Sequence, residues 1–284
     1  MKKYRIHALR AAVAIVLLSS FAIAQDNDHP DRQYLALGDS FTFAYITQAG
    51  FEYVNPQNFV GFPDYVGLRK RLDVVNAACP GETAGSFLSA TAPDNGCRSF
   101  RAAAPLHVRY TSTQLEFAKS FLLTHRDTKL VTVSLGANDV KLLQQACLGD
   151  LTCIRAGLQP VLGQLVYDIL TILGDLRATG YRGPIVVLNY YSTDYTDLNL
   201  TGVIAALNQA LALAAGQGGA LVADLFTTFK AAALPAGGRT CVAGLLNASP
   251  HNQFLCDDHP SQSGHLLAAK TIAQTLGQTE DNER

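Results

Sequence analysis

The stretch Leu35-Ala36-Leu37-Gly38-Asp39-Ser40 decides the fold of this chain. A short apolar run followed by glycine is typical of a buried strand that turns sharply at its end. A serine directly after such a strand presents its hydroxyl at the edge of a sheet, where the clefts of α/β proteins form. Gly-Asp-Ser is also ordinary turn chemistry. The role of Ser40 therefore depends on what the rest of the chain supplies.

Short apolar segments alternate with helical segments along the rest of the chain. We expect strands at 34–38, 73–78, 129–135, 184–189 and 220–225, and helices at 61–72, 113–125, 158–179, 200–215 and 261–276. The remaining long stretches, up to Pro105 and at 235–258, are expected to be loops. This alternation predicts an α/β fold with three layers, α/β/α, around a five-stranded parallel sheet. A flavodoxin-like strand order, 2-1-3-4-5, would bring the ends of the first three strands together.

The first 24 residues are typical of a secretory signal peptide. Four basic residues, Lys2, Lys3, Arg5 and Arg10, precede an apolar run that ends in Ala22-Ile23-Ala24. This is the small-x-small pattern of a cleavage site, and the run is shorter than the roughly 20 residues of a membrane span. An uncleaved anchor is the alternative. We expect residues 25–284 to form a single domain that is secreted, to the extracellular space or the periplasm.

The charge and the cysteines narrow the class further. Without the signal segment the chain keeps 18 basic and 23 acidic residues. This mildly acidic composition, without a basic patch, argues against nucleic-acid binding. An even number of cysteines in a secreted chain suggests disulfides. Six cysteines allow 15 connectivities, and we expect sequential pairing within three local couples: Cys79/Cys97, Cys147/Cys153 and Cys241/Cys256. Their spacing matches no zinc or CxxC redox site, so we expect no metal site. We also expect the protein to be a monomer.

Small or polar residues follow three of the expected strands. The first strand ends in Gly38-Asp39-Ser40, the second is followed by Pro80-Gly81, and the third ends in Gly136-Ala137-Asn138-Asp139. Near the C-terminus, Asp257-Asp258-His259-Pro260 is expected to open the last helix. The carboxyl ends of parallel strands meet at one edge, and the loop before the last helix can return there. Taken singly, a turn asparagine and a helix-start histidine need no further function.

Together these four blocks resemble those of the SGNH, or GDSL, hydrolase superfamily. The resemblance extends from Tyr34 to Leu276, and the segment 76–83 with the six cysteines resembles the secreted, disulfide-bonded bacterial branch of lipases and esterases. It implies a serine hydrolase that cleaves carboxylic esters through an acyl-enzyme, without a cofactor. In this reading Ser40 is the nucleophile and His259 is its base, since a hydroxyl is a poor nucleophile until a base takes its proton. The backbone N–H groups of Ser40 and Gly81 and the side-chain amide of Asn138 are the expected oxyanion hole.

One position departs from the family pattern. Members usually carry an aspartate three residues before the histidine, and here that position is Cys256. The main-chain carbonyl of Cys256 or the side chain of Asp257 could instead orient the imidazole of His259. The sequence predicts a Ser40–His259 dyad and leaves the third member open.

The aromatic residues bear on the substrate. The stretch Phe41–Tyr65 holds eight of the chain's 24 aromatic residues, which could pack in the core or line a groove beside the serine. Together with Tyr190, Tyr191 and Tyr195, they favour an acyl or aryl ester as the substrate. This ester could be a small molecule or a lipid, which the protein would contact transiently at a lipid surface. The alternatives are a carbohydrate acetyl-esterase of the same fold, a secreted binding module without activity, and a disulfide-rich structural protein.

Overall fold

A five-stranded parallel sheet in the order β2-β1-β3-β4-β5 runs through the centre of the protein. The computed structural model describes residues 32–249 and 252–282, which form one compact unit. The strands are β1 (Gln33–Gly38), β2 (Asp73–Asn76), β3 (Leu130–Ser134), β4 (Ile185–Leu188) and β5 (Leu221–Ala223). The predicted fold class and strand order are confirmed. The expected signal peptide lies outside the described residues.

The central strands are apolar because both faces of the sheet are covered. Every residue of β3 and β4 is buried, as expected for a parallel sheet between two helical layers. The hydroxyls of Tyr34 and Thr132, both buried in the sheet, form a hydrogen bond with each other at 2.8 Å. Gly38 pairs with Ser134 in register. The ends of β1 and β3 therefore lie next to each other.

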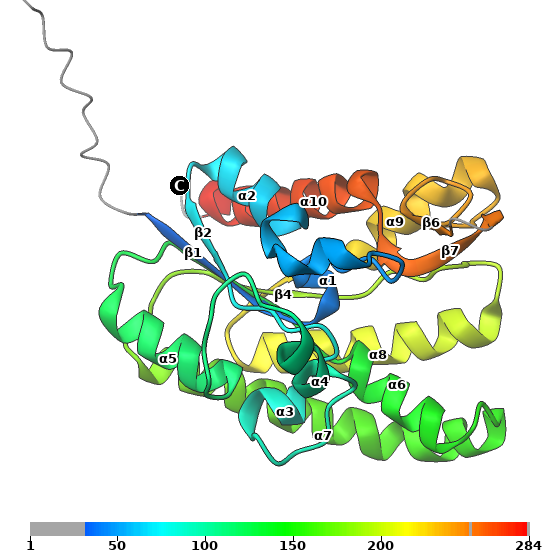
Figure 1. The fold of residues 1–284 in the computed structure, drawn as a ribbon, viewed down its shortest axis with the longest axis horizontal. Helices are drawn as coiled ribbons and strands as arrows, with labels where there is room; N and C mark the ends of the chain where they lie inside the picture. The colour runs from blue at the N-terminus through cyan, green and yellow to red at the C-terminus, as the bar shows by residue number, and fades with distance from the viewer. Residues whose placement is uncertain (1–31, 250–251, 283–284) are drawn as a thin grey trace, which may run out of the picture. The chain divides into compact units, whose positions relative to one another are not determined.

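Helices cover the two faces of the sheet. Figure 1 shows α2 (Phe62–Lys70), α9 (Leu225–Ala233) and α10 (Gln262–Asn282) on one side, and α5 (Gln114–Thr124), α7 (Leu151–Ala178) and α8 (Leu198–Gln217) on the other. Helices α7 and α8 are long and apolar enough, by length and composition, to cross a membrane. Both also pack against each other and bury leucines in the core, and the core helices of soluble proteins share that composition.

Some helix ends follow directly from the sequence. At the start of α5 the hydroxyl of Thr113 accepts from the N–H of Glu116, whose carboxylate accepts from the N–H of Thr113, a reciprocal capping box. Helix α7 begins at Leu151, earlier than the predicted 158, and contains Pro160. Asp150 caps it by accepting from the N–H of Cys153 at 2.7 Å. The local disulfide at Cys153 fixes this additional first part, which no apolar period in the sequence indicates.

Several stretches to which the sequence analysis assigns no helix or strand contain regular structure. They hold α1 (Ser40–Phe43), two 3₁₀ turns (Phe51–Val54 and Pro56–Asn58), α3 (Ala84–Leu88), α4 (Cys97–Ala103), α6 (Ala137–Ala146), α9, and the strands β6 (Leu246–Ser249) and β7 (Asn252–Pro260). The prediction of a loop at 235–258 is therefore wrong for 246–249 and 252–258, where β6 and β7 form an antiparallel pair with register shifts. Irregular pairing hides the alternation by which strands are recognised.

The six cysteines form three disulfides, Cys79–Cys97, Cys147–Cys153 and Cys241–Cys256. This is the sequential pairing that the sequence analysis expects. The first links the loop after β2 to α4, the second joins α6 to α7, and the third ties β7 to the segment before β6. Two of the three therefore lie close in sequence to Gly81 and to His259.

Candidate active site

Ser40 stands at the turn between β1 and α1. Asp39 caps α1: its Oδ1 accepts from the N–H of Phe41 at 3.0 Å, while its own N–H donates to the carbonyl of Ser134 at 3.1 Å. Gly38 has φ +144°, and a Cβ there would lie 2.4 Å from the Ser134 carbonyl oxygen. Only glycine fits this close approach, so the turn that presents the hydroxyl of Ser40 is determined by the sequence.

His259 connects Ser40 to Asp257. Its Nε2 lies 2.9 Å from Ser40 Oγ and its Nδ1 lies 2.6 Å from Asp257 Oδ1. The second oxygen of Asp257 accepts from the backbone N–H of Thr47 at 2.7 Å. His259 lies near the end of β7, and the last helix begins at Gln262, so the expectation that His259 opens that helix is wrong. Of the two groups that the sequence left open, the carboxylate of Asp257 occupies the position beside Nδ1.

The surroundings keep Asp257 ionised. Burial opposes the charged form, but the hydrogen bond and positive charge of His259 and the bond from Thr47 outweigh it, so the pKa of Asp257 lies below its usual range. The ring of Tyr45 lies over this pair, with 5.0 Å between its centroid and that of the imidazole. An ionised carboxylate at Nδ1 favours the tautomer whose Nε2 can accept a proton.

Gly81 and Asn138 lie across the cleft from His259. Gly81 has φ +85°, and a Cβ on it would lie 2.4 Å from the carbonyl oxygen of Asn95. This contact within the protein is one reason for glycine at this position. Asn138 is 3% exposed, and its Nδ2 donates to the carbonyl of Glu82 at 2.9 Å and, more weakly, to Asp39 Oδ2 at 3.4 Å. Its Oδ1 accepts from Asn95, which fixes the orientation of the amide.

Two backbone donors face no acceptor in the described residues. The N–H of Ser40, at the first position of α1, and the N–H of Gly81 donate to no protein group in the described part of the chain. Unpaired backbone donors are uncommon where water is excluded. They are suited to an oxygen that is brought by a ligand.

Two buried carboxyls, Asp39 and Asp139, hold the loops that form the cleft. Burial raises the pKa of Asp39 to about 6, against the lowering effect of the hydroxyl of Tyr190, which donates to its Oδ2 at 2.8 Å. Burial likewise raises the pKa of Asp139 to about 6. Asp139 accepts from the N–H of Ala84 at the start of α3. Neither carboxyl bonds to Ser40 or His259, so both fix the loops that carry the site.

Two cavities meet at Ser40 and His259. One, of about 190 Å³, is mainly apolar and reaches under α8, where it is lined by Phe41, Val140, Tyr191, Leu200, Val203, Ile204 and Leu207. The other, of about 480 Å³, is more open and is lined by Tyr45, Pro80, Gly81, Asn95, Gly96, Ser99, Phe100 and Ala103. Ser40, Asn138, Lys141 and His259 border both. A ligand can therefore reach the serine from two sides.

The aromatic residues divide between packing and cleft. Phe43, Phe59 and Phe62 are buried, whereas Phe41 and Tyr45 border the two cavities. In the later group, the hydroxyls of Tyr190 and Tyr191 bond to Asp39 and to the Asp258 carbonyl. The hydroxyl of Tyr195 instead bonds to the carbonyl of Phe226, and Tyr195 lines neither cavity.

The sequence analysis missed several groups of the site: Lys141, Thr47 and the hydrogen bonds made by the hydroxyls of Tyr190 and Tyr191. Lys141 pairs with Asp258 at 2.6 Å at the rim of the cleft. Nothing in the local sequence marks Lys141, because its place depends on how α6 meets the end of β7. Thr47 contributes only its backbone N–H, which any residue other than proline could supply.

Two groups of side chains have the spacing of metal ligands. Cys79, Glu82 and Cys97 form one, and Asp257, Asp258 and His259 form the other. The two cysteines are joined in a disulfide and so offer no thiolate, the form that binds metals. In the second group the nitrogens of His259 are already engaged by Asp257 and Ser40. Neither group fits a metal in this arrangement.

Comparison with known proteins identifies a family for this chain. Residues 36–267 match the profile of the GDSL-like lipase/acylhydrolase family. No curated protein sequence matches the chain.

Two solved structures illustrate the shared fold. An acetylxylan esterase from Geobacillus stearothermophilus superposes with a TM-score of 0.52 at 17% identity, over 87% of this chain and 94% of the other. A phospholipase A1 from Streptomyces albidoflavus gives a TM-score of 0.55 at 16% identity, over 86% and 99%. These likenesses concern the fold. The profile match spans most of the chain, from β1 into α10, and on that ground the protein belongs to the GDSL-like lipase/acylhydrolase family.

Proposed function

We propose that the protein is a secreted serine esterase that hydrolyses acyl esters through an acyl-enzyme. The observation that carries this proposal is the continuous chain of contacts from Ser40 Oγ through His259 to Asp257, at 2.9 and 2.6 Å. A nucleophile, a base and a group that orients the base are what acyl transfer to serine requires.

In the proposed first step, Ser40 Oγ attacks the ester carbonyl and His259 Nε2 takes its proton. The imidazolium that forms is stabilised by the carboxylate of Asp257. The negative charge moves to the former carbonyl oxygen. The free N–H groups of Ser40 and Gly81 supply two donors for it, and Asn138 Nδ2 supplies a third by giving up its long bond to Asp39.

In the following steps His259 returns the proton to the leaving alcohol, and the acyl group stays on Ser40 Oγ. Water then enters, and His259 takes a proton from it as its oxygen attacks the acyl carbonyl. His259 returns this proton to Ser40 Oγ as the acyl–oxygen bond breaks, which releases the acid and restores Ser40. The order of proton transfers is reversed between the two halves of the reaction. Apart from the ester and water, both halves use the groups named above.

The apolar cavity under α8 supports an acyl chain as the group held on the acid side. Its volume is about 190 Å³, and a methylene is close in size to a water molecule, which occupies about 30 Å³ in the liquid. The cavity therefore has room for about six such groups. We propose short to medium acyl chains, with the alcohol in the open cavity beside Gly81.

Secretion is part of the proposal and rests on separate observations. The three disulfides are typical of an oxidising compartment, and the N-terminal pattern of basic head, apolar run and Ala22-Ile23-Ala24 is typical of a cleaved signal.

The polar part of the open cavity, with Asn95 and Ser99, favours a carbohydrate acetyl-esterase as the second candidate.

A chain-length series of p-nitrophenyl esters tests the proposal. We expect cleavage by the wild-type protein, with kcat/KM rising from acetate to about the hexanoate or octanoate, and no cleavage by Ser40→Ala. A maximum at acetate would favour the carbohydrate acetyl-esterase. Unchanged cleavage by Ser40→Ala would exclude Ser40 as the nucleophile, and a correctly folded wild-type protein without activity would favour a binding module.

A further inference from the structure

Glu82, the residue after Gly81, is a buried carboxyl that the proposed reaction does not use. Its side chain lies inside the loop between β2 and α3 and is 3% exposed. No lysine, arginine or histidine among the described residues forms an ion pair with it. A buried carboxyl without such a partner is costly to maintain, which suggests a role beyond packing.

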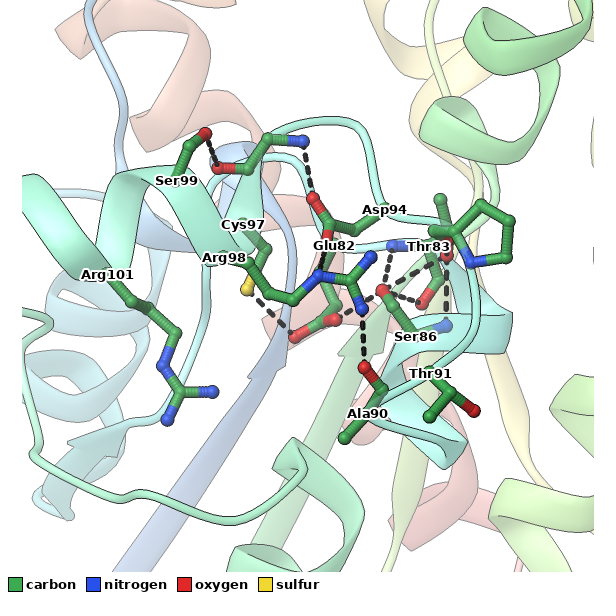
Figure 2. A network of polar contacts seen from close by, with 12 residues as sticks. Glu82, Thr83, Ser86, Ala90, Thr91, Asp94, Cys97, Arg98, Ser99 and Arg101 are labelled. Carbon is green, nitrogen blue, oxygen red and sulfur yellow. Dashed lines mark hydrogen bonds and ion pairs between the residues drawn. The ribbon is translucent and has the colours of Figure 1, made fainter.

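Four contacts tie Glu82 to its surroundings, and Figure 2 shows the side chain beside Ser86 and Cys97. Its Oε1 accepts from the hydroxyl of Ser86 at 2.5 Å, and its Oε2 accepts from Gln114 Nε2 at 3.1 Å. Its backbone N–H donates to the carbonyl of Cys79 at 3.1 Å. Its backbone carbonyl accepts from Asn138 Nδ2 at 2.9 Å. Glu82 thus contacts Asn138 through its main chain and Gln114 through its side chain.

Gln114 carries this connection to the strand that precedes Ser40. Its Oε1 accepts from the N–H of Gly38 at 2.6 Å, and its Nε2 donates to the Gly38 carbonyl at 3.0 Å. These two bonds fix the orientation of the amide, since turning it over would place donor against donor and acceptor against acceptor. Gln114 therefore needs an acceptor in the place where Glu82 Oε2 lies.

We propose that Glu82 is a positioning residue for the oxyanion hole. Through Gln114 it fixes the end of β1 that leads to Ser40, through its own backbone it fixes Gly81, and through its carbonyl it holds the amide of Asn138. The three donors belong to three separate segments of the chain. Glu82 adjoins Gly81, contacts Asn138, and reaches the strand before Ser40 through Gln114. This inference rests on the proposed function, because it assigns Glu82 a role only in stabilising the oxyanion.

The effect of this role is specific to the transition state. Donors that are displaced by a fraction of an ångström still admit the substrate but no longer converge on the oxygen that becomes charged. A loss in kcat with little change in KM is the expected signature. A residue that only stabilises the fold would lower the thermal stability and leave kcat per correctly folded molecule unchanged.

Two substitutions of Glu82 separate positioning from charge. Burial raises the pKa of Glu82 to about 7, against the hydrogen bonds from Ser86 and Gln114 and the charge of Arg101. A substitution that keeps the hydrogen bonds and removes the charge therefore tests positioning by itself. In Glu82→Gln the amide oxygen can accept from Gln114 while its NH₂ donates to the oxygen of Ser86. In Glu82→Ala both partners lose their acceptor and a cavity opens beneath Gly81.

The test measures kcat and KM on one p-nitrophenyl ester, the rate of inactivation by a serine-reactive phosphonate, and Tm. We expect Glu82→Ala to lower kcat and the inactivation rate by about 10²-fold with KM within about threefold. Glu82→Gln should recover most of this loss. Thr132→Val, which removes a buried hydrogen bond to Tyr34 in the sheet, is the control that lowers Tm without changing kcat.

Gln114→Ala provides a second route if Glu82→Ala does not fold. It should lower kcat in the same selective way, and the double variant should lose less than the two single losses combined, because both interrupt one connection. Normal kcat in Glu82→Ala or in Gln114→Ala, or equal losses in Glu82→Ala and Glu82→Gln, would overturn the positioning role while the esterase proposal stands. A folded wild-type protein that cleaves no ester would overturn both.

Discussion

At the scale of single residues, Asp257 has the largest consequence for the proposed chemistry. It lies two positions before His259, where the family pattern has no carboxylate, and yet its Oδ1 is 2.6 Å from the imidazole Nδ1. The bond from Thr47 to its other oxygen holds the carboxylate in place. A carboxylate from a neighbouring position thus reaches the site that Cys256, bound in a disulfide, cannot fill with its side chain.

Asp257→Asn tests this assignment. The amide presents either a neutral oxygen or a donor to Nδ1, so we expect kcat to fall on the order of 10⁴-fold, as for the same change in serine proteases. Asp258→Asn is the comparison: that carboxylate is 46% exposed and lies 3.2 Å from Nδ1, and a loss below about tenfold is expected for such a partly exposed pair. Near-normal rates in Asp257→Asn would instead favour the Cys256 carbonyl.

Asn138→Ala tests the third oxyanion donor. Removing one such donor typically lowers kcat by about 10²–10³-fold, and we expect a loss in this range with a much smaller change in KM. Steady-state kinetics on the preferred p-nitrophenyl ester give both constants. A change in kcat below about threefold, set against the usual effect of a lost donor, would remove Asn138 from the oxyanion hole.

The sequence predicts the residues that acyl transfer requires, but it does not predict the residues that reach the site through packing. Ser40, Gly81, Asn138 and His259 stand at strand ends or near the last helix, and parallel topology brings such ends together. Lys141 and the hydroxyl of Tyr190 reach the site through contacts between distant segments. Such contacts follow from the packing of side chains, which no local pattern records.

At the scale of elements, the long segments were predictable and the short ones were not. The strands of the sheet and helices such as α5 and α8 have a clear apolar period. Elements such as α3, α4 and the β6–β7 hairpin are brief, and two of the disulfides tie their ends to neighbouring segments. Their formation depends on covalent links and tertiary contacts, so propensity alone does not reveal them.

Helix α8 sets the depth of the apolar cavity, which Ile204→Phe tests. Ile204 lines this cavity, so the larger ring should occupy part of it and exclude about three methylenes, at about 0.8 kcal/mol each. We therefore expect kcat/KM for the octanoate to fall by about 50-fold relative to that for the acetate. Leu213→Phe, on the exposed side of the same helix with 52% of its surface accessible, is the matched control. An equal effect on both esters would contradict the assignment of this cavity to the acyl chain.

At the scale of the whole molecule, the fold brings the first and last parts of the described chain together beside the site. β1 and α1 come from the first part of the described chain and α10 from the last, and His265 of α10 connects them. It is 3% exposed, its Nδ1 accepts from the N–H of Phe62 at 3.2 Å, and its ring stacks on Phe41. From the sequence, His265 falls on the expected last helix and is predicted to be structural, but nothing near it in the chain marks the contacts with Phe62 and Phe41.

His265 should make the stability of the protein sensitive to acid. Burial, with a smaller contribution from the charge of His259, lowers its pKa to about 3. The unfolded chain binds this proton below about pH 6.5, whereas the folded protein does not until about pH 3, so the free energy of unfolding falls as the pH drops through this window. Between pH 7 and pH 4 this group should cost about 3 kcal/mol.

Urea unfolding at both pH values, for the wild type and for His265→Asn, measures this difference. The asparagine oxygen can accept from Phe62 but does not titrate, so the variant should lose about 3 kcal/mol less between the two pH values. Equal losses in the two proteins would show that His265 does not carry the acid sensitivity.

The central claim is that Ser40 is activated by His259 and carries the acyl group. Mass spectrometry after reaction with a serine-reactive phosphonate tests it most directly, because the reagent forms a stable adduct on the nucleophile. We expect one adduct per molecule, on the peptide that contains Ser40, with esterase activity lost in proportion to labelling and no adduct in His259→Ala. An adduct on another residue, or full activity after complete labelling of Ser40, would contradict the account.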